Sequence, residues 1–94
     1  MDSTRVQRSE VYYSGHVQGI GFRYTTQQIA RSFAVTGFVR NLSDGRVCLV
    51  VEAEKGEITR FLKEIDGRLG EYIRDVKVAE LASSGEFTGF SIRR

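Results

Sequence analysis

The spacing of apolar residues in the second half of the chain constrains the fold most, because it defines a helix. Five of them recur at i, i+3, i+4, i+7 and i+11: Ile58, Phe61, Leu62, Ile65 and Leu69. This spacing predicts an amphipathic helix over about 57–66, ended near Gly67. A second set at helical spacing predicts another amphipathic helix over 22–34. Its members are Phe22, Thr26 through its methyl group, Ile29, Ala30, Phe33 and Ala34.

Segments rich in β-branched and aromatic residues surround these helices and predict strands. Three of them lie at 10–17, 72–82 and 90–94. Between the two helices, residues 37–53 ("GFVRNLSDGRVCLVVEA") contain apolar runs on both sides of Ser43-Asp44-Gly45. Asp-Gly between apolar runs is typical of a hairpin, so we expect two strands there.

The resulting order is β-α-β-β-α-β with a short additional strand at the C-terminus. Two split βαβ units that share a hairpin predict a ferredoxin-like two-layer α+β sandwich: an antiparallel sheet with both helices on one face. A chain of 94 residues is long enough for one such domain and too short for two. We expect a disordered polar tail over 1–8 and a single domain over 9–94. A core of this size leaves little room for a cavity, so we expect the site at a surface loop.

Composition excludes several classes of function. Fourteen Lys and Arg against twelve Asp and Glu give a net charge of +2, spread along the chain, which argues against a nucleic-acid partner. One cysteine and one histidine cannot form a Cys/His metal site, and we expect neither metal nor cofactor. The opening "MDSTRVQRSE" lacks the apolar run of a secretion signal, and no segment approaches the ~20 apolar residues of a membrane span. We therefore expect a cytoplasmic monomer without membrane contact.

The candidate site is the glycine-rich stretch "GHVQGIGFR", Gly15 to Arg23, between the first strand and the first helix. A loop that enters a helix start presents backbone N–H groups without intrahelical partners, and glycines let these groups converge on an anion. Arg23, in the first turn, adds a planar fork of donors suited to phosphate. The stretch matches neither a Walker A motif nor a dinucleotide-binding motif. A purely structural interpretation, in which Gly19 and Gly21 only shape the turn, stays open at this point.

The chain resembles the acylphosphatase family in "GHVQGIGFR", in the following "GFVRNLSDG" and in the closing "FSIR", over about Val11 to Arg93. The resemblance implies hydrolysis of acyl phosphates to a carboxylate and inorganic phosphate, without metal or covalent intermediate. It makes Arg23 and Asn41 the catalytic residues: Arg23 would hold the phosphoryl oxygens and the Asn41 amide would orient the attacking water. It also implies six substrate-binding residues in the loop: Val17, Gln18, Gly19, Ile20, Gly21 and Phe22.

Several residues are open to other interpretations. Gln18 could shape the loop without touching substrate. His16 and Cys48 are assigned no catalytic role. Where Ala34 and Phe38 stand, members of the family commonly have glycine and tryptophan. Ala34 then requires either a different helix end or a left-handed alanine, at a cost of about 1 kcal/mol.

Three other functions compete with hydrolysis by a free-standing enzyme. An RNA-recognition domain shares the order of elements but needs aromatic residues on its third strand, and "RVCLVVEA" has none. A regulatory domain that binds phosphate or acyl phosphate without hydrolysis would keep the loop but would not need Asn41. The third is an acylphosphatase-like module that acts on carbamoyl phosphate within a larger maturation enzyme. The absence of an attached domain in the 94 residues favours the free-standing hydrolase over this module.

Overall fold

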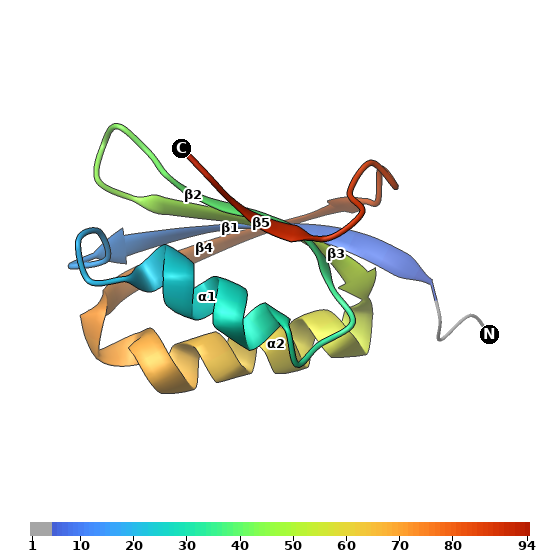
Figure 1. The fold of residues 1–94 in the computed structure, drawn as a ribbon, viewed down its shortest axis with the longest axis horizontal. Helices are drawn as coiled ribbons and strands as arrows, with labels where there is room; N and C mark the ends of the chain where they lie inside the picture. The colour runs from blue at the N-terminus through green and yellow to red at the C-terminus, as the bar shows by residue number, and fades with distance from the viewer. Residues whose placement is uncertain (1–4) are drawn as a thin grey trace.

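The computed structural model describes residues 5–94. Two helices and five strands follow the predicted order, and a single 3-10 turn is added after the second helix (Figure 1). The elements are β1 (Val6–Gly15), α1 (Phe22–Ala30), β2 (Thr36–Asn41), β3 (Val47–Glu54), α2 (Lys55–Leu69), η1 (Gly70–Tyr72), β4 (Ile73–Ala82) and β5 (Phe90–Arg93).

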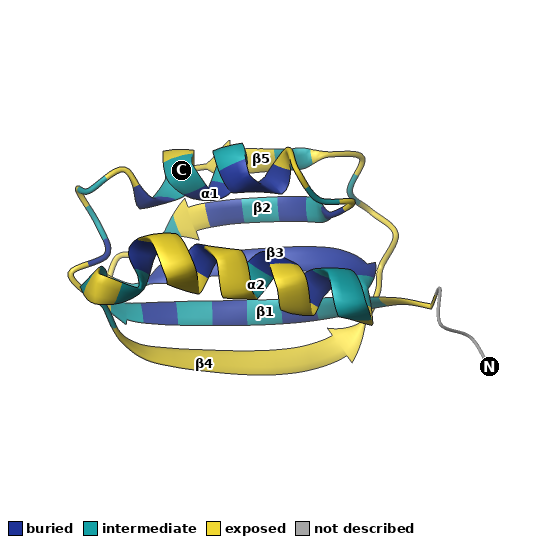
Figure 2. Ribbon diagram, turned by 90° about the horizontal axis from the view of Figure 1, so that it is seen from below, coloured by how far each residue is buried: buried dark blue, intermediate teal, exposed yellow. Residues whose placement is uncertain are grey.

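The strands form one sheet in the order β4-β1-β3-β2-β5, and both helices lie on the same face of it (Figures 1 and 2). The pairs β1–β4, β1–β3 and β2–β3 are antiparallel, as predicted. The sheet is nevertheless mixed, because β5 pairs with β2 in parallel. The chain re-enters the sheet from the end at which β4 finishes, so β5 runs opposite to β4 and therefore along β2. The predicted ferredoxin-like α+β sandwich is confirmed, with this parallel edge as an addition.

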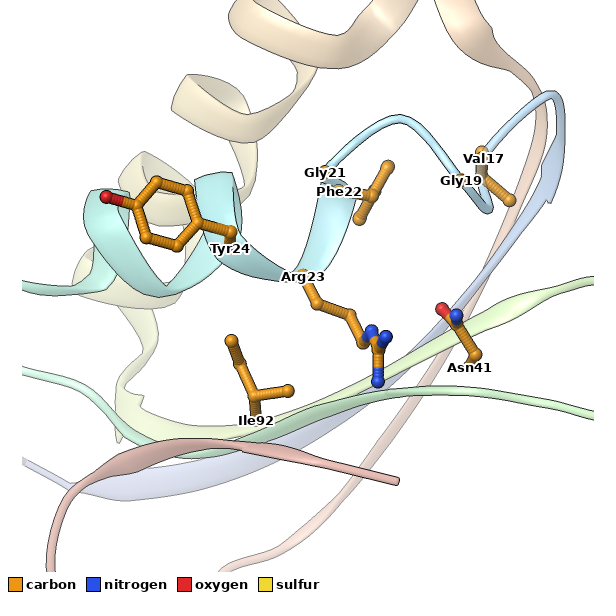
Figure 3. A pocket seen from close by; sticks show the side chains of 8 residues that line it. All are labelled: Val17, Gly19, Gly21, Phe22, Arg23, Tyr24, Asn41 and Ile92. Atoms are coloured by element: carbon orange, nitrogen blue, oxygen red, sulfur yellow. The ribbon is translucent and has the colours of Figure 1, made fainter.

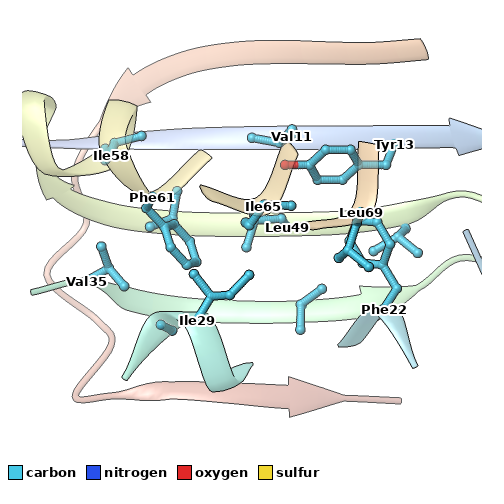
Figure 4. Close-up of a cluster of buried hydrophobic side chains, with 14 of the residues drawn as sticks. Val11, Tyr13, Phe22, Ile29, Val35, Leu49, Ile58, Phe61, Ile65 and Leu69 are labelled. Carbon is cyan, nitrogen blue, oxygen red and sulfur yellow. The ribbon is translucent and has the colours of Figure 1, made fainter. Parts of the chain in front are cut away.

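The core lies between the sheet and the helices, where α1 packs on β2 and β5 and α2 packs on β1 and β3. Alternate residues of β1, such as Val11 and Tyr13, face α2, and the predicted apolar face of α2 meets them through Phe61 and Ile65 (Figure 4). The ring of Phe22 lies 5.0 Å from that of Tyr13. This contact fixes the first residue of α1 to β1, so packing sets where the helix begins.

Both helices differ in length from the prediction. α1 ends at Ala30, because the N–H groups of the next three residues bond back three positions, to the carbonyls of residues 28–30, and tighten the chain into a turn. Within residues 5–94 only glycines have a positive φ, so the helix end has changed and Ala34 is not left-handed. α2 starts at Lys55 and runs through Gly67 to Leu69. Burial of Leu69 favours a helix that extends past Gly67, because glycine inside a helix costs only about 1 kcal/mol relative to alanine.

The first strand begins earlier than expected, since β1 already includes residues 6–8 of the predicted tail. These residues pair with β3, and residues 7 and 8 also pair with β4. Arg8 is stabilised there by ion pairs with Glu52 and Glu86, at 3.2 and 2.9 Å. Long-range pairing thus outweighs a polar local sequence. Residues 1–4 of the predicted tail lie outside the described residues.

Glu52 anchors the segment between β4 and β5 on the sheet face opposite the helices. Its carboxylate accepts hydrogen bonds from the Ser84 N–H at 2.8 Å, the Ser84 hydroxyl at 2.8 Å, the Gly85 N–H at 3.0 Å and Arg8 at 3.2 Å. Burial alone raises the pKa of Glu52, but these hydrogen bonds together outweigh burial and hold the pKa below its ordinary value. The segment that leads into β5 is therefore tied to the sheet by a buried charge.

Candidate active site

The loop between β1 and α1 ends in an uncapped helix start. Gly19 and Gly21 have φ of 81° and 82°, a left-handed conformation that favours glycine. Gly21 is the N-cap of α1; no side chain caps this helix end, and its first turn carries no acidic residue. Within the described chain, the first N–H of α1 that has an acceptor is that of Thr25, which bonds to the Gly21 carbonyl at 2.9 Å. The preceding N–H groups are therefore free to bind an anion.

Three contacts hold this loop in place. Val17 is fully buried, and the His16 N–H donates to the Tyr72 carbonyl at 2.9 Å. Gln18 Nε2 donates to the carbonyls of Leu42 and Arg46 at 2.8 and 2.9 Å, which fastens the loop to the β2–β3 hairpin. Gln18 therefore shapes the loop, the interpretation that the sequence had left open.

Arg23 and Asn41 approach the same space from different elements. Arg23 belongs to the first turn of α1, and its guanidinium Nη1 donates to the Arg93 carbonyl at 3.3 Å. Asn41 is the last residue of β2, and its amide and the Arg23 guanidinium lie toward each other (Figure 3). Among residues 5–94 the Asn41 amide has no hydrogen-bond partner. The amide is thus available for a ligand or a water molecule.

Both side chains line one surface pocket of about 200 Å³. Its lining residues are Val17, Gly19, Gly21, Phe22, Arg23, Tyr24, Asn41 and Ile92. All the predicted site residues are among them except Gln18 and Ile20, and Ile20 packs against the core instead. Sequence reasoning missed Tyr24 and Ile92. Tyr24 directly follows Arg23 and could have been found from that position, whereas Ile92 reaches the pocket only through β5.

The pocket presents donors and apolar groups. No carboxylate is among its lining residues, and Arg23 is the charged group in it. Such a lining suits a compact anion better than a cation. Nowhere in residues 5–94 do three His, Cys, Asp or Glu side chains gather as metal ligands would.

The two residues that were assigned no role, His16 and Cys48, are not among the lining residues of this pocket. Cys48 is buried in β3, and burial raises the pKa of its thiol. A thiol with a raised pKa is a poor nucleophile.

As for the rest of the fold, the helices of the described residues are too short or too polar to cross a membrane.

Comparisons with known proteins agree with the fold. A family model of acylphosphatase matches residues 9–92. The acylphosphatase of Oceanobacillus iheyensis is 40% identical over 86 residues, which cover 89% of this chain and 94% of that protein. The crystal structure of acylphosphatase from Bacillus subtilis has a TM-score of 0.84 and 28% identity, with 94% of this chain and 99% of that chain covered.

A domain of a much larger protein is similar as well. The crystal structure of full-length HypF in its phosphate- and nucleotide-bound form has a TM-score of 0.83 and 29% identity, and covers 97% of this chain. Only 12% of the HypF chain is covered. In contrast, the Bacillus subtilis acylphosphatase is matched over nearly its whole length. Together with the match of the family model over most of the chain, these similarities show that the chain belongs to the acylphosphatase family.

Proposed function

We propose that the pocket binds the phosphoryl group of an acyl phosphate and catalyses its hydrolysis to a carboxylate and inorganic phosphate. The observation that carries the proposal is the placement of Arg23 opposite Asn41, with unpaired loop N–H groups beside them and no carboxylate in the lining. A phosphoryl group bears its negative charge on several oxygens, which matches a fork of donors together with converging N–H groups.

Each residue then has a distinct part. The Arg23 guanidinium and the N–H groups of the loop bind the non-bridging phosphoryl oxygens, and the Asn41 amide holds the attacking water. The water oxygen forms a bond to phosphorus while the bond between phosphorus and the acyl oxygen breaks. The electron pair of the broken bond stays on the leaving carboxylate. The protons of the water pass to phosphate and solvent.

The site needs little besides positioning. The leaving carboxylate has a conjugate acid with a pKa of about 4 to 5, in the range of Asp and Glu, so no general acid is required. Transfer of a phosphoryl group through a loose transition state depends mainly on alignment and on stabilisation of charge. Guanidinium, amide and backbone donors supply both, which supports metal-independent hydrolysis.

The proposal is tested by hydrolysis of acetyl phosphate in EDTA by the wild-type protein and by Asn41→Ala. We expect wild-type turnover in EDTA, and a loss of about 100-fold or more in kcat for the variant, the scale for removal of one preorganised polar group. Phosphate affinity, measured by calorimetry, should be retained. Gln28→Ala is the matched control, because it removes an amide of α1 that does not line the pocket.

Three outcomes would contradict parts of the proposal. Loss of activity in EDTA would contradict metal independence. Near-normal turnover in Asn41→Ala would refute the role of Asn41. Phosphate binding without any wild-type turnover would instead identify a non-catalytic domain that binds phosphate.

A further inference from the structure

We propose that Tyr24 and Ile92 form the acyl-binding end of the pocket and select acyl phosphates whose acyl group is bulky and apolar. The inference rests on the proposed function, and concerns the two lining residues to which no role has been given. Both are exposed for apolar residues of a small domain: Tyr24 is 61% exposed and Ile92 is 37% exposed. Single exposed apolar residues are ordinary, but these two border the same pocket.

The pocket has two chemically different ends. Figure 3 shows Tyr24 and Ile92 on one side of Arg23, and Gly19 and Asn41 on the other. The Arg23 guanidinium extends toward Asn41, so the polar groups gather at that end. Tyr24 and Ile92 line the other end, and the Tyr24 ring is directed away from the Arg23 guanidinium (Figure 3). The two ends thus suit the two halves of an acyl phosphate.

The register of the sheet sets the spacing between these ends. Ile92 pairs with Val39, a buried residue two positions before Asn41, so all three point toward the helix side. Two residues along β2 and one strand across correspond to a Cα separation of about 8 Å between Asn41 and Ile92. Asn41 and Ile92 therefore line different parts of the pocket.

The in-line arrangement of the attacking and leaving oxygens indicates which part of the substrate occupies the apolar end. In a phosphoryl transfer the attacking and leaving oxygens lie roughly in line through phosphorus. If Asn41 holds the water, the carboxylate leaves on the side away from Asn41. Tyr24 and Ile92 lie on that side of Arg23. The acyl group therefore lies beside Tyr24 and Ile92, and an aromatic or branched acyl group makes more apolar contact there than acetyl does.

The experiment compares kcat/KM for benzoyl phosphate and acetyl phosphate in the wild type, Tyr24→Ala and Ile92→Ala. These substrates share the phosphoryl group and differ in the acyl group. We expect the wild type to prefer benzoyl phosphate, and the ratio of the two values to fall about tenfold in each alanine variant, the scale for lost apolar contacts in a pocket. Tyr24→Phe keeps the ring and should keep the ratio. Val78→Ala is the control, because Val78 is an exposed apolar residue of β4 outside the pocket.

Three other outcomes would overturn this inference. If Tyr24→Ala and Ile92→Ala leave the ratio unchanged, or lower both values equally, the acyl-binding role is wrong while acyl phosphate hydrolysis stands. If Tyr24→Phe lowers the ratio as much as Tyr24→Ala, the hydroxyl and not the ring acts, which also overturns the proposal. A wild-type protein that hydrolyses neither substrate would overturn the proposed function and this inference with it. Circular dichroism of the purified variants establishes that each is folded before its kinetics are compared.

Discussion

Arg23 occupies the first turn of α1, where its positive charge opposes the helix dipole unless an anion is bound. The Arg93 carbonyl holds one guanidinium nitrogen at 3.3 Å and so orients the plane of the group. The remaining N–H groups of the guanidinium can face a phosphoryl group. At the scale of the single residue, then, the planar shape of arginine matters as much as its charge.

We predict that Arg23→Ala loses phosphate binding and lowers kcat/KM by about 100-fold or more. Arg23→Lys should not restore either property, because an ammonium cannot reproduce the planar fork. Calorimetry with inorganic phosphate and steady-state kinetics with acetyl phosphate measure the two effects. Arg31→Lys, at an exposed arginine beyond the end of α1, is the control. Recovery of most activity in Arg23→Lys would show that charge alone is sufficient.

At the scale of elements, the glycine at the start of α1 and the glycine inside α2 have different backbone conformations. Gly21 caps α1 with a φ of 82°, while Gly67 lies inside α2 without a positive φ. A Cβ at either position would meet nothing within 4 Å. Crowding is therefore absent at both sites, and only the backbone conformation distinguishes them.

We predict that alanine has opposite effects on stability at these two positions. Gly21→Ala should lower the free energy of unfolding by about 1 kcal/mol, because alanine is strained in the left-handed region. Gly67→Ala should raise it by up to about 1 kcal/mol, because alanine loses less backbone entropy in a helix. Urea denaturation of the two variants beside the wild type measures both changes. Equal effects of the same sign would contradict the assigned conformations.

At the scale of the whole molecule, Glu52 links the two ends of the described chain. It joins Arg8 of β1 to the segment that leads from β4 into β5. The Glu52 carboxyl has a lower pKa in the folded state than its ordinary value of 4.5. The stabilisation that follows is fully present above about pH 4.5 and is lost as the pH falls through the folded pKa. Acid should therefore weaken the attachment of β5.

We predict that Glu52→Gln lowers the free energy of unfolding at pH 7 by about 1–3 kcal/mol, since it removes a buried, hydrogen-bonded charge. The variant should also lose less stability than the wild type between about pH 5 and pH 3. Urea denaturation over this pH range measures both effects. Glu64→Gln, at an exposed ion pair with Arg68, is the control. A variant that loses as much stability in acid as the wild type would show that other carboxyl groups cause the loss.

Local patterns were sufficient for much of the fold and of the pocket. The apolar spacing that includes Phe61 and Ile65 predicted α2, because helical periodicity alone decides which face is buried. Gly19 and Gly21 predicted the turn that exposes N–H groups, since a left-handed backbone favours glycine wherever it occurs. The ends of elements were less predictable. α1 stops at Ala30 and α2 continues past Gly67, because packing on the sheet outweighs local preference at helix ends.

The sequence by itself determined the order of strands and helices, the glycine turn and the presence of Arg23 at a helix start, since each depends on neighbours within a few residues. Only the tertiary structure decided what the turn faces. Ile92 and Asn41 enter the pocket from strands far apart in the chain, and Arg8 joins a strand through pairing and a buried carboxylate. Such contacts depend on sheet register and on the parallel pairing of β5. These are long-range properties that no local pattern of residues encodes.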